Sequence, residues 1–327
     1  MSEDACRVGF DLGGTKMLAA IYDQSFTEVG RHRRKTKGHE GAERGLRRIT
    51  ETIATALENA EKTTSQLQGI GIGCPGPVDM DKGTLIEAVN LGWRDVELQK
   101  QLEDRFQCPV AVLNDVDAGV YGEFRFGAAK GVDSALGVFP GTGIGGGFVY
   151  KGEILHGTTS SCMEIGHIRV MADGPKCGCG RYGCLETLAS RLAISAAAAQ
   201  AAYRGEAPYL MKKAGTTLGD IRSGLLADAV AAGDSAVEEI IRRAAVYIGI
   251  GVASVMNLVL PDIIVLGGGL VEAMPEIFVK TVGKSIREHI MPAYEETVKV
   301  EAAVLGDDAA IRGAVGWVQN QSEANHE

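Results

Sequence analysis

Residues 7–23 read RVGFDLGGTKMLAAIYD, and residues 133–155 read DSALGVFPGTGIGGGFVYKGEIL. In each stretch an apolar run leads into glycines and a second apolar run follows, which is the pattern of a strand, a tight turn and a second strand. The two turns are 128 residues apart, counted from Gly13 to Gly141. Two such hairpins at corresponding points of the chain predict a duplicated α/β architecture in which each half contributes one glycine loop.

Between the hairpins the chain alternates helical and strand patterns. Residues 42–62 carry apolar side chains at helical spacing, and residues 95–106 and 116–126 also read as helices. Apolar runs predict strands within 69–79 and 109–115. After the second hairpin the pattern repeats.

The second half continues with an Ala-rich helical region at 189–204 and a helix that starts at about residue 235. A strand that runs into glycines is predicted at 262–270, and closing helices follow. The basic run at 31–38 is interpreted as a solvated strand edge or loop, with an anion-binding arm as the alternative.

The segment from Ala244 to Pro261 has no formal charge and is long enough to span a membrane. Gly249, Gly251 and Asn257 interrupt its apolar character, and a second apolar run follows Pro261. We therefore expect a buried helix, a turn and a core strand here.

The composition is that of a globular protein with about two domains. The chain has 327 residues, of which 45% are hydrophobic. We expect an N-terminal α/β domain at 1–125, joined by a C-terminal helix at about 307–320, and a second α/β domain at 126–306. The second domain would contain the second hairpin and the glycine run at 267–269.

Charge and cysteine content narrow the possible partners and the compartment. The net charge of −9 disfavours nonspecific binding to nucleic acids or membrane surfaces, since both are anionic. Seven cysteines, an odd number without regular spacing, fit a reducing compartment, and the start of the chain lacks a secretory h-region. We expect a cytoplasmic protein.

Both glycine turns have the composition of a phosphate-binding loop. We call residues 11–16 (DLGGTK) the first glycine loop and residues 141–147 (GTGIGGG) the second glycine loop. Glycine allows close backbone approach, so successive N–H groups can surround anionic oxygens. Asp11 is placed to hold a metal-bound water beside a nucleotide. The predicted nucleotide-binding residues are Asp11, Gly13, Gly14, Thr15, Lys16, Gly141, Thr142, Gly143, Gly145, Gly267, Gly268 and Gly269.

Each loop alone is also compatible with an ordinary tight hairpin. Neither fits the P-loop pattern, because no Gly-Lys-Ser/Thr sequence ends a strand-to-helix turn. The second loop contains a G-x-G-x-x-G match, but Phe148 to Tyr150 read as strand rather than helix, so the match is discounted. Two such loops and a third glycine run favour nucleotide binding.

A cluster of cysteines and one histidine predicts a metal site. Residues 164–186 read EIGHIRVMADGPKCGCGRYGCLE. One imidazole and three thiolates complete a closed, tetrahedral, structural zinc site, which leaves no open position for hydrolytic chemistry. Ordinary buried thiols are the alternative. The predicted zinc ligands are His167, Cys177, Cys179 and Cys184.

These motifs together resemble the ROK family (repressors, open reading frames and sugar kinases), a branch of the hexokinase/actin-like superfamily. The resemblance runs through DLGGTK, CPGPVD, NLGW, ND, GTGIGGG, EIGH and CGCGRYGCLE, and covers nearly the whole chain. It implies duplicated actin-like ATPase (ribonuclease H-like) domains with a nucleotide between them and the sugar deep in the cleft. It also implies a homodimer or a dimer of dimers.

The resemblance assigns roles to individual residues. Asp115 is similar to the family's catalytic base, which accepts the proton of the attacking sugar hydroxyl. The residues similar to the family's sugar site are Gly76, Asn90, Asn114, Asp115, Glu164, His167 and Glu186. Three positions depart from the usual pattern. Met163 stands where glycine commonly precedes the glutamate, Asp117 where asparagine is frequent, and Pro140 precedes the second glycine loop.

The resulting expectation is a Mg-ATP-dependent sugar kinase with a structural zinc, which transfers the γ-phosphate to the 6-hydroxyl of a hexose, with glucose favoured. Kinases of N-acetylmannosamine, fructose and other hexoses are the alternatives. A sugar-sensing transcriptional regulator is the alternative of another class, disfavoured because Asp11 leaves ten residues before it, too few for a helix-turn-helix. A zinc-assisted nucleic-acid module is disfavoured by the acidic charge.

Overall fold

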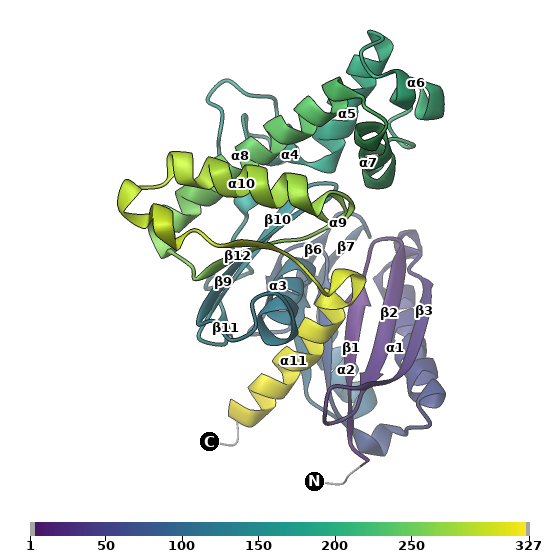
Figure 1. The fold of residues 1–327 in the computed structure, drawn as a ribbon. Helices are drawn as coiled ribbons and strands as arrows, with labels where there is room; N and C mark the ends of the chain where they lie inside the picture. The colour runs from purple at the N-terminus through teal and green to yellow at the C-terminus, as the bar shows by residue number, and fades with distance from the viewer. Residues whose placement is uncertain (1–3, 325–327) are drawn as a thin grey trace. The chain divides into compact units, whose positions relative to one another are not determined.

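The structure is a computed structural model that describes residues 4–324. Two five-stranded sheets form its framework (Figure 1). The first has the order β3-β2-β1-β4-β8 and the second the order β11-β10-β9-β12-β13. Numbered from the start of each half, both orders are 3-2-1-4-5, with the parallel pairs at the equivalent places. The predicted duplication and the α/β fold class are confirmed.

The strands of the first sheet are β1 (Cys6–Leu12), β2 (Lys16–Tyr22), β3 (Glu28–Lys35), β4 (Leu67–Cys74) and β8 (Val110–Asn114). Those of the second are β9 (Ser134–Pro140), β10 (Ile144–Tyr150), β11 (Glu153–Ile154), β12 (Ile263–Leu266) and β13 (Val300–Ala302). A third, antiparallel sheet contains β5 (Val78–Asp79), β6 (Thr84–Ala88) and β7 (Trp93–Val96). The basic run at 31–38 begins on β3, an edge strand, as expected.

The α-helices are α1 (Ala42–Asn59), α2 (Leu98–Phe106), α3 (Asp115–Phe126), α4 (Glu186–Ala189), α5 (Arg191–Tyr203), α6 (Pro208–Ala214), α7 (Ser223–Ala231), α8 (Ser235–Val259), α9 (Gly269–Ala273), α10 (Pro275–His289) and α11 (Ala309–Ala324). Some predicted bounds are wrong. Residues 95–96 belong to β7 because Val96 pairs with β6, and the strand predicted to reach residue 270 ends at Leu266 because Gly268 turns with φ 81°.

The chain divides into two compact units. Unit 1 comprises the chain up to Gly131, then Phe148–Cys162, and the chain from Asp307 onward. Unit 2 comprises Val132–Gly147 and Met163–Gly306, so the division falls inside β10. Residues 148–162 belong to unit 1 together with the N-terminal residues. The domain bounds predicted from the sequence put this segment in the second domain. The expected domain division itself stays a prediction.

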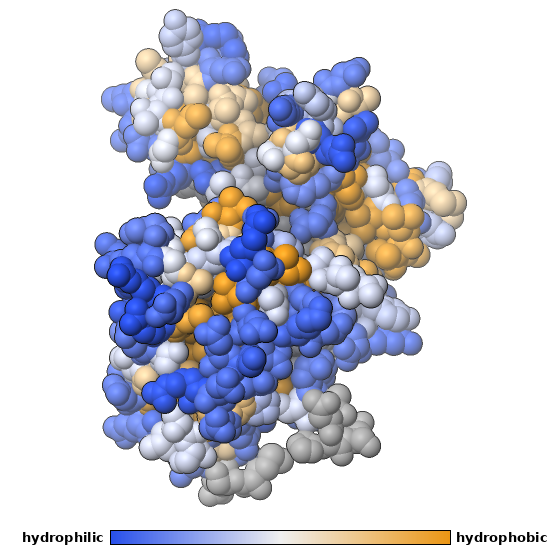
Figure 2. Space-filling model, turned by 180° about the vertical axis from the view of Figure 1, so that it is seen from behind, coloured by the Kyte–Doolittle hydropathy of each residue, from blue (hydrophilic) through white to orange (hydrophobic). Residues whose placement is uncertain are grey.

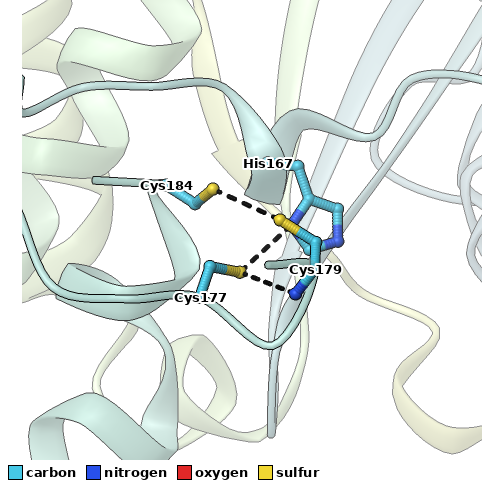
Figure 3. Close-up of side chains that lie close together, drawn as sticks. All are labelled: His167, Cys177, Cys179 and Cys184. Atoms are coloured by element: carbon cyan, nitrogen blue, oxygen red, sulfur yellow. Dashed lines mark hydrogen bonds between the residues drawn. The ribbon is translucent and has the colours of Figure 1, made fainter. Parts of the chain in front are cut away.

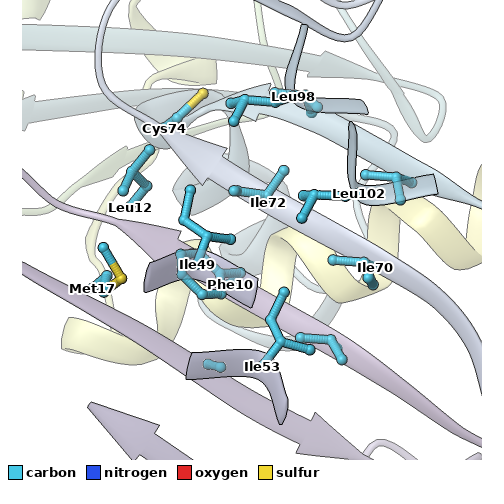
Figure 4. Packing of buried hydrophobic residues seen from close by; sticks show 14 of the residues in the cluster. Phe10, Leu12, Met17, Ile49, Ile53, Ile70, Ile72, Cys74, Leu98 and Leu102 are labelled. Carbon is cyan, nitrogen blue, oxygen red and sulfur yellow. The ribbon is translucent and has the colours of Figure 1, made fainter. Parts of the chain in front are cut away.

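The two faces of the first sheet bury alternate residues of β2. Met17, Ala19 and Ile21 belong to the core under α1 and α2, which Figure 4 shows around Phe10, Ile49 and Ile72. The intervening residues Leu18, Ala20 and Tyr22 pack instead against Ile311 and Val315 of α11. Period-2 alternation therefore continues through a strand whose residues are nearly all buried, because helices cover both faces.

Glycine lets α11 approach the first sheet closely. A Cβ on Gly71 of β4 would lie 1.9 Å from the backbone carbonyl oxygen of Ala314 in α11. A Cβ on Gly9, the β1 residue paired with Gly71, would lie 2.3 Å from the carbonyl oxygen of Ile311. The missing side chains thus set the distance between helix and sheet.

We expect Gly71→Ala to destabilise the protein by about 1–3 kcal/mol, because the added methyl must displace helix backbone. Urea unfolding of Gly71→Ala and of Gly69→Ala measures this. Gly69 is the matched control on the same strand, since its Cβ would meet a Val318 side-chain methyl at 3.1 Å. Equal stability of the two variants would contradict the role given to Gly71.

The apolar segment that begins at Ala244 lies in α8, most of whose apolar residues are buried. The chain turns at Leu260 and continues into the buried strand β12, as predicted from the sequence. In the described residues, no helix has the length and apolar character that crossing a membrane requires.

Apolar side chains also lie on the surface. Figure 2 shows hydrophobic side chains gathered in patches among hydrophilic ones on the face that it draws. The most exposed large ones are Leu258, at 84%, Val89, at 82%, and Tyr203, at 81%. Monomeric proteins also expose apolar residues, so these do not by themselves indicate a dimer. The homodimer stays a prediction.

Candidate active site

In unit 1 the predicted base stands where a strand becomes a helix. Strand β8 ends at Asn114, and Asp115 is the first residue of α3 rather than the last of the strand. Asn114 caps the helix, because its Oδ1 accepts hydrogen bonds from the N–H groups of Val116 (2.9 Å) and Asp117 (3.3 Å). The helix dipole stabilises the negative charge of Asp115 at this position.

The turn at Gly76 is tied to this junction. The Asn114 Nδ2 donates a hydrogen bond to the Gly76 carbonyl oxygen at 3.0 Å. Gly76 has φ 90°, and a Cβ there would lie 2.0 Å from the Glu87 carbonyl oxygen. Only glycine fits this turn without backbone movement. Gly76, Asn114 and Asp115 are therefore neighbours, as the predicted sugar site requires.

Asn90 lies beside the first glycine loop. A Cβ on Gly14 would lie 3.5 Å from the Asn90 Cβ, and both residues are exposed. Thr36 also holds the loop, since its hydroxyl donates to the Gly13 carbonyl oxygen at 2.6 Å. Lys16 is exposed at the start of β2. Residues 14–16 of the loop are thus exposed.

Asp11 and Asp115 influence each other electrostatically. Burial and then the Asp115 charge raise the pKa of Asp11 from 3.8 to about 7, while Arg33 opposes the shift. The charge of Asp307 acts in the same direction as that of Asp115. The magnesium ion expected beside Asp11 stays a prediction.

In unit 2 the second glycine loop connects β9 to β10, and two other segments border it. A Cβ on Gly143 would lie 2.8 Å from Glu186 Oε2, which places this predicted sugar ligand at the loop. The third glycine run also reaches it: a Cβ on Gly268 would lie 3.0 Å from the carbonyl oxygen of Pro140, the residue before the loop. Two of the predicted nucleotide-binding segments therefore lie together.

Glu164 and His167 bound a 3-10 turn, and both side chains are exposed. The residue before Glu164, Met163, has φ 60°, a left-handed conformation that glycine adopts at lower cost. This backbone conformation explains why glycine is common at the position. Met163, which stands where the family commonly has glycine, is therefore a strained residue beside a predicted sugar ligand.

The predicted zinc ligands converge (Figure 3). One ligand atom from each of the four residues lies within 4.8 Å of all the others. The Sγ atoms of Cys179 and Cys184 are 3.7 Å apart, and Cys177 Sγ is 3.6 Å from His167 Nδ1. A tetrahedral zinc separates two sulfurs by about 3.8 Å and a sulfur from a nitrogen by about 3.6 Å, so the residues fit the metal.

Glu186 connects the zinc cluster to the second glycine loop. Its Oε1 accepts a hydrogen bond from the Cys177 thiol at 2.9 Å and lies 3.7 Å from His167 Nδ1. Burial and this hydrogen bond raise the pKa of Cys177 to about 12. His167 turns Nδ1 toward the cluster, which leaves Nε2 for another partner.

The structure brings the predicted residues together within each unit. Unit 1 contains the groups around Asp11, Asn90 and Asp115, and unit 2 those around Glu164 and Glu186. Arg191, whose guanidinium contacts Thr142, was not predicted from the sequence. A basic residue at the start of the Ala-rich helix was the available signal. The individual roles of all these residues stay predictions.

The chain is similar to known proteins that act on or respond to sugars. A glucokinase of Halalkalibacterium halodurans is 33% identical over 99% of this chain and 98% of its own. A putative xylose repressor of Caldicellulosiruptor is 30% identical, over 95% of this chain and 77% of its own. The solved structure of a ROK family glucokinase from Streptomyces griseus, in complex with glucose and AMPPNP, is 31% identical with a TM-score of 0.82, over 97% of this chain and 100% of that one.

The family match extends over both units. The ROK family model matches residues 7–321, which include the two glycine loops, the predicted base and the cysteine cluster. The similarity to the S. griseus structure covers the same elements and confirms the actin-like ATPase fold. The chain belongs to the ROK family.

Proposed function

We propose that the chain is an ATP-dependent glucokinase that transfers the γ-phosphate of Mg-ATP to the 6-hydroxyl of glucose. The expectation of a sugar phosphotransferase is confirmed by the full-length similarity to glucokinases. Glucose as acceptor and ATP as donor are supported by the names of these relatives and by the glucose and AMPPNP bound in the S. griseus enzyme.

The observation that carries the proposal is the position of Asp115. Its carboxylate stands at the first position of α3, its backbone fixed by the Asn114 cap. A carboxylate at this position can accept the proton of the 6-hydroxyl as that oxygen attacks the γ-phosphorus. Phosphoryl transfer asks little other covalent chemistry of the protein, since positioning and charge stabilisation supply most of the catalysis.

The other residues are proposed to bind and orient. Asn90, Asn114, Glu164, His167 and Glu186 offer amide, carboxylate and imidazole groups to sugar hydroxyls, and a site of this kind rejects analogues that lack a hydroxyl. The glycine loops offer backbone N–H groups to phosphate oxygens. Magnesium, when bound, would neutralise phosphate charge near Asp11, and zinc would hold the cysteine loop in place.

An ADP-release assay over a panel of sugars tests the proposal. We expect kcat/KM for glucose to exceed that for mannose, fructose, N-acetylmannosamine and N-acetylglucosamine by about tenfold or more. 6-Deoxyglucose, the matched control, should bind and give no turnover, because the accepting oxygen is missing. If another hexose gave the highest kcat/KM, that hexose would replace glucose as the proposed acceptor. Turnover of 6-deoxyglucose would exclude the 6-hydroxyl as the oxygen that accepts the phosphate.

The similarity to a xylose repressor favours a second candidate, a sugar-responsive regulator. Its signature would be tight, salt-sensitive binding to duplex DNA that changes with sugar. A gel shift with and without glucose and xylose measures this. DNA binding together with an absence of sugar-dependent ADP release would favour the regulator over the kinase.

A further inference from the structure

An arginine adjoins the second glycine loop. Arg191 is the first residue of α5, a helix of 13 residues that is capped by Ser190. Its backbone N–H donates to the Gly141 carbonyl oxygen at 2.8 Å. Its guanidinium Nη2 donates to the Thr142 hydroxyl oxygen at 2.9 Å. Main chain and side chain of one residue therefore hold two successive residues of the loop.

The Arg191 guanidinium brings a positive charge to this loop, and most of its N–H donors have no partner within the described residues. Residues 141–147 carry no charge of their own. Across residues 4–324, no carboxylate forms an ion pair with Arg191, whereas Arg204 at the other end of α5 is paired with Glu206 at 2.8 Å. A guanidinium has five N–H donors, of which the Thr142 contact uses one. The remaining donors are available to an anion at the loop.

We propose that Arg191 binds the phosphates of the nucleotide, an inference that rests on the proposed kinase function. Its planar fork matches two phosphate oxygens, and its charge supplements the backbone N–H groups of the loop. Because Arg191 donates to the oxygen of Thr142, the hydroxyl proton of Thr142 is left to donate to the same phosphate. Hydrogen bonds in such a chain strengthen one another.

The position of the loop does not depend on this side chain alone. The bond from the backbone N–H of residue 191 to Gly141 persists with any residue other than proline. The Ser190 cap, whose Oγ accepts from the Ala193 N–H at 3.2 Å, also persists. A substitution at Arg191 thus removes the charge and the fork while the anchor of the loop stays.

Calorimetric titrations of Arg191→Gln with ATP, ADP and adenosine, without sugar so that no turnover consumes the ATP, test the proposal. We expect Kd for ATP and ADP to rise by about tenfold or more and Kd for adenosine to stay within about twofold. Arg191→Lys, which keeps the charge without the fork, should lie between Arg191→Gln and the wild type. Arg204→Gln, at the residue that caps the other end of α5, is the matched control and should bind all three like the wild type.

Two outcomes would overturn the inference. Unchanged affinity of Arg191→Gln for ATP and ADP would remove Arg191 from the phosphate site. An equal loss for adenosine would show that the substitution distorts the site as a whole. Failure of the proposed function looks different, because the wild type itself would then neither bind ATP nor release ADP with any sugar.

Discussion

Asp115→Asn is expected to lower kcat by about 10²–10⁴-fold while glucose and ATP still bind. Asparagine has the shape of aspartate, so its Oδ1 can keep the 2.9 Å hydrogen bond from the Val116 N–H. The Asn114 cap of α3 is untouched. Only the ability to accept a proton is lost. Coupled ADP release gives kcat, and calorimetry gives the glucose Kd and the melting temperature.

Asp104→Asn, an exposed change on α2 in the same unit, is the control and should leave kcat unchanged. A second readout concerns Asp11, whose pKa the Asp115 charge helps to raise to about 7. Removing that charge should lower the Asp11 pKa, as followed by carboxyl NMR. A kcat for Asp115→Asn within a few-fold of the wild type would refute its role as base, whatever Asp11 does.

The repeated sheets could be predicted because their signal is local. Each hairpin shows its alternation and its glycines within about twenty residues. Its two strands are neighbours in the structure, and the first of them, β1 or β9, is the central strand of its sheet. The small sheet of β5, β6 and β7 was not predicted. Strand β7 buries Trp93 and Val96 and exposes the two charged residues between them, so it lacks the alternation that marks a strand in the sequence.

In the candidate site, too, only features formed by residues close in sequence could be predicted. The three cysteines and their glycines lie within eight residues, so their convergence followed from the sequence. Arg191 was missed because its partner Thr142 is 49 residues away and only the folded chain brings them together. The strain at Met163 was also out of reach, since φ 60° is a property of the loop and not of the residue type.

Cys179→Ser is expected to reduce bound zinc from about one per chain to almost none and to weaken glucose binding by about tenfold or more. Cys179 is exposed, so the change leaves the buried Cys177 and Cys184 packed. Without metal the thiol of Cys177 is protonated, and it donates to Glu186 Oε1 at 2.9 Å. That acceptor is then unavailable to a sugar hydroxyl, and His167 loses the ligand bond that fixes its ring.

Metal content by mass spectrometry and glucose affinity by calorimetry, measured on the same samples, test the coupling. Cys162→Ser is the matched control, because Cys162 is partly buried, lies one residue before Met163 and does not belong to the cluster. Chelation of the wild type should reproduce the loss of Cys179→Ser, and added zinc should restore the wild type but not the variant. Zinc loss with unchanged glucose affinity would separate the metal from the acceptor site and leave the cluster a role in stability alone, since the four ligands join the turn at 165–167 to the loop at 177–184 whether or not sugar binds.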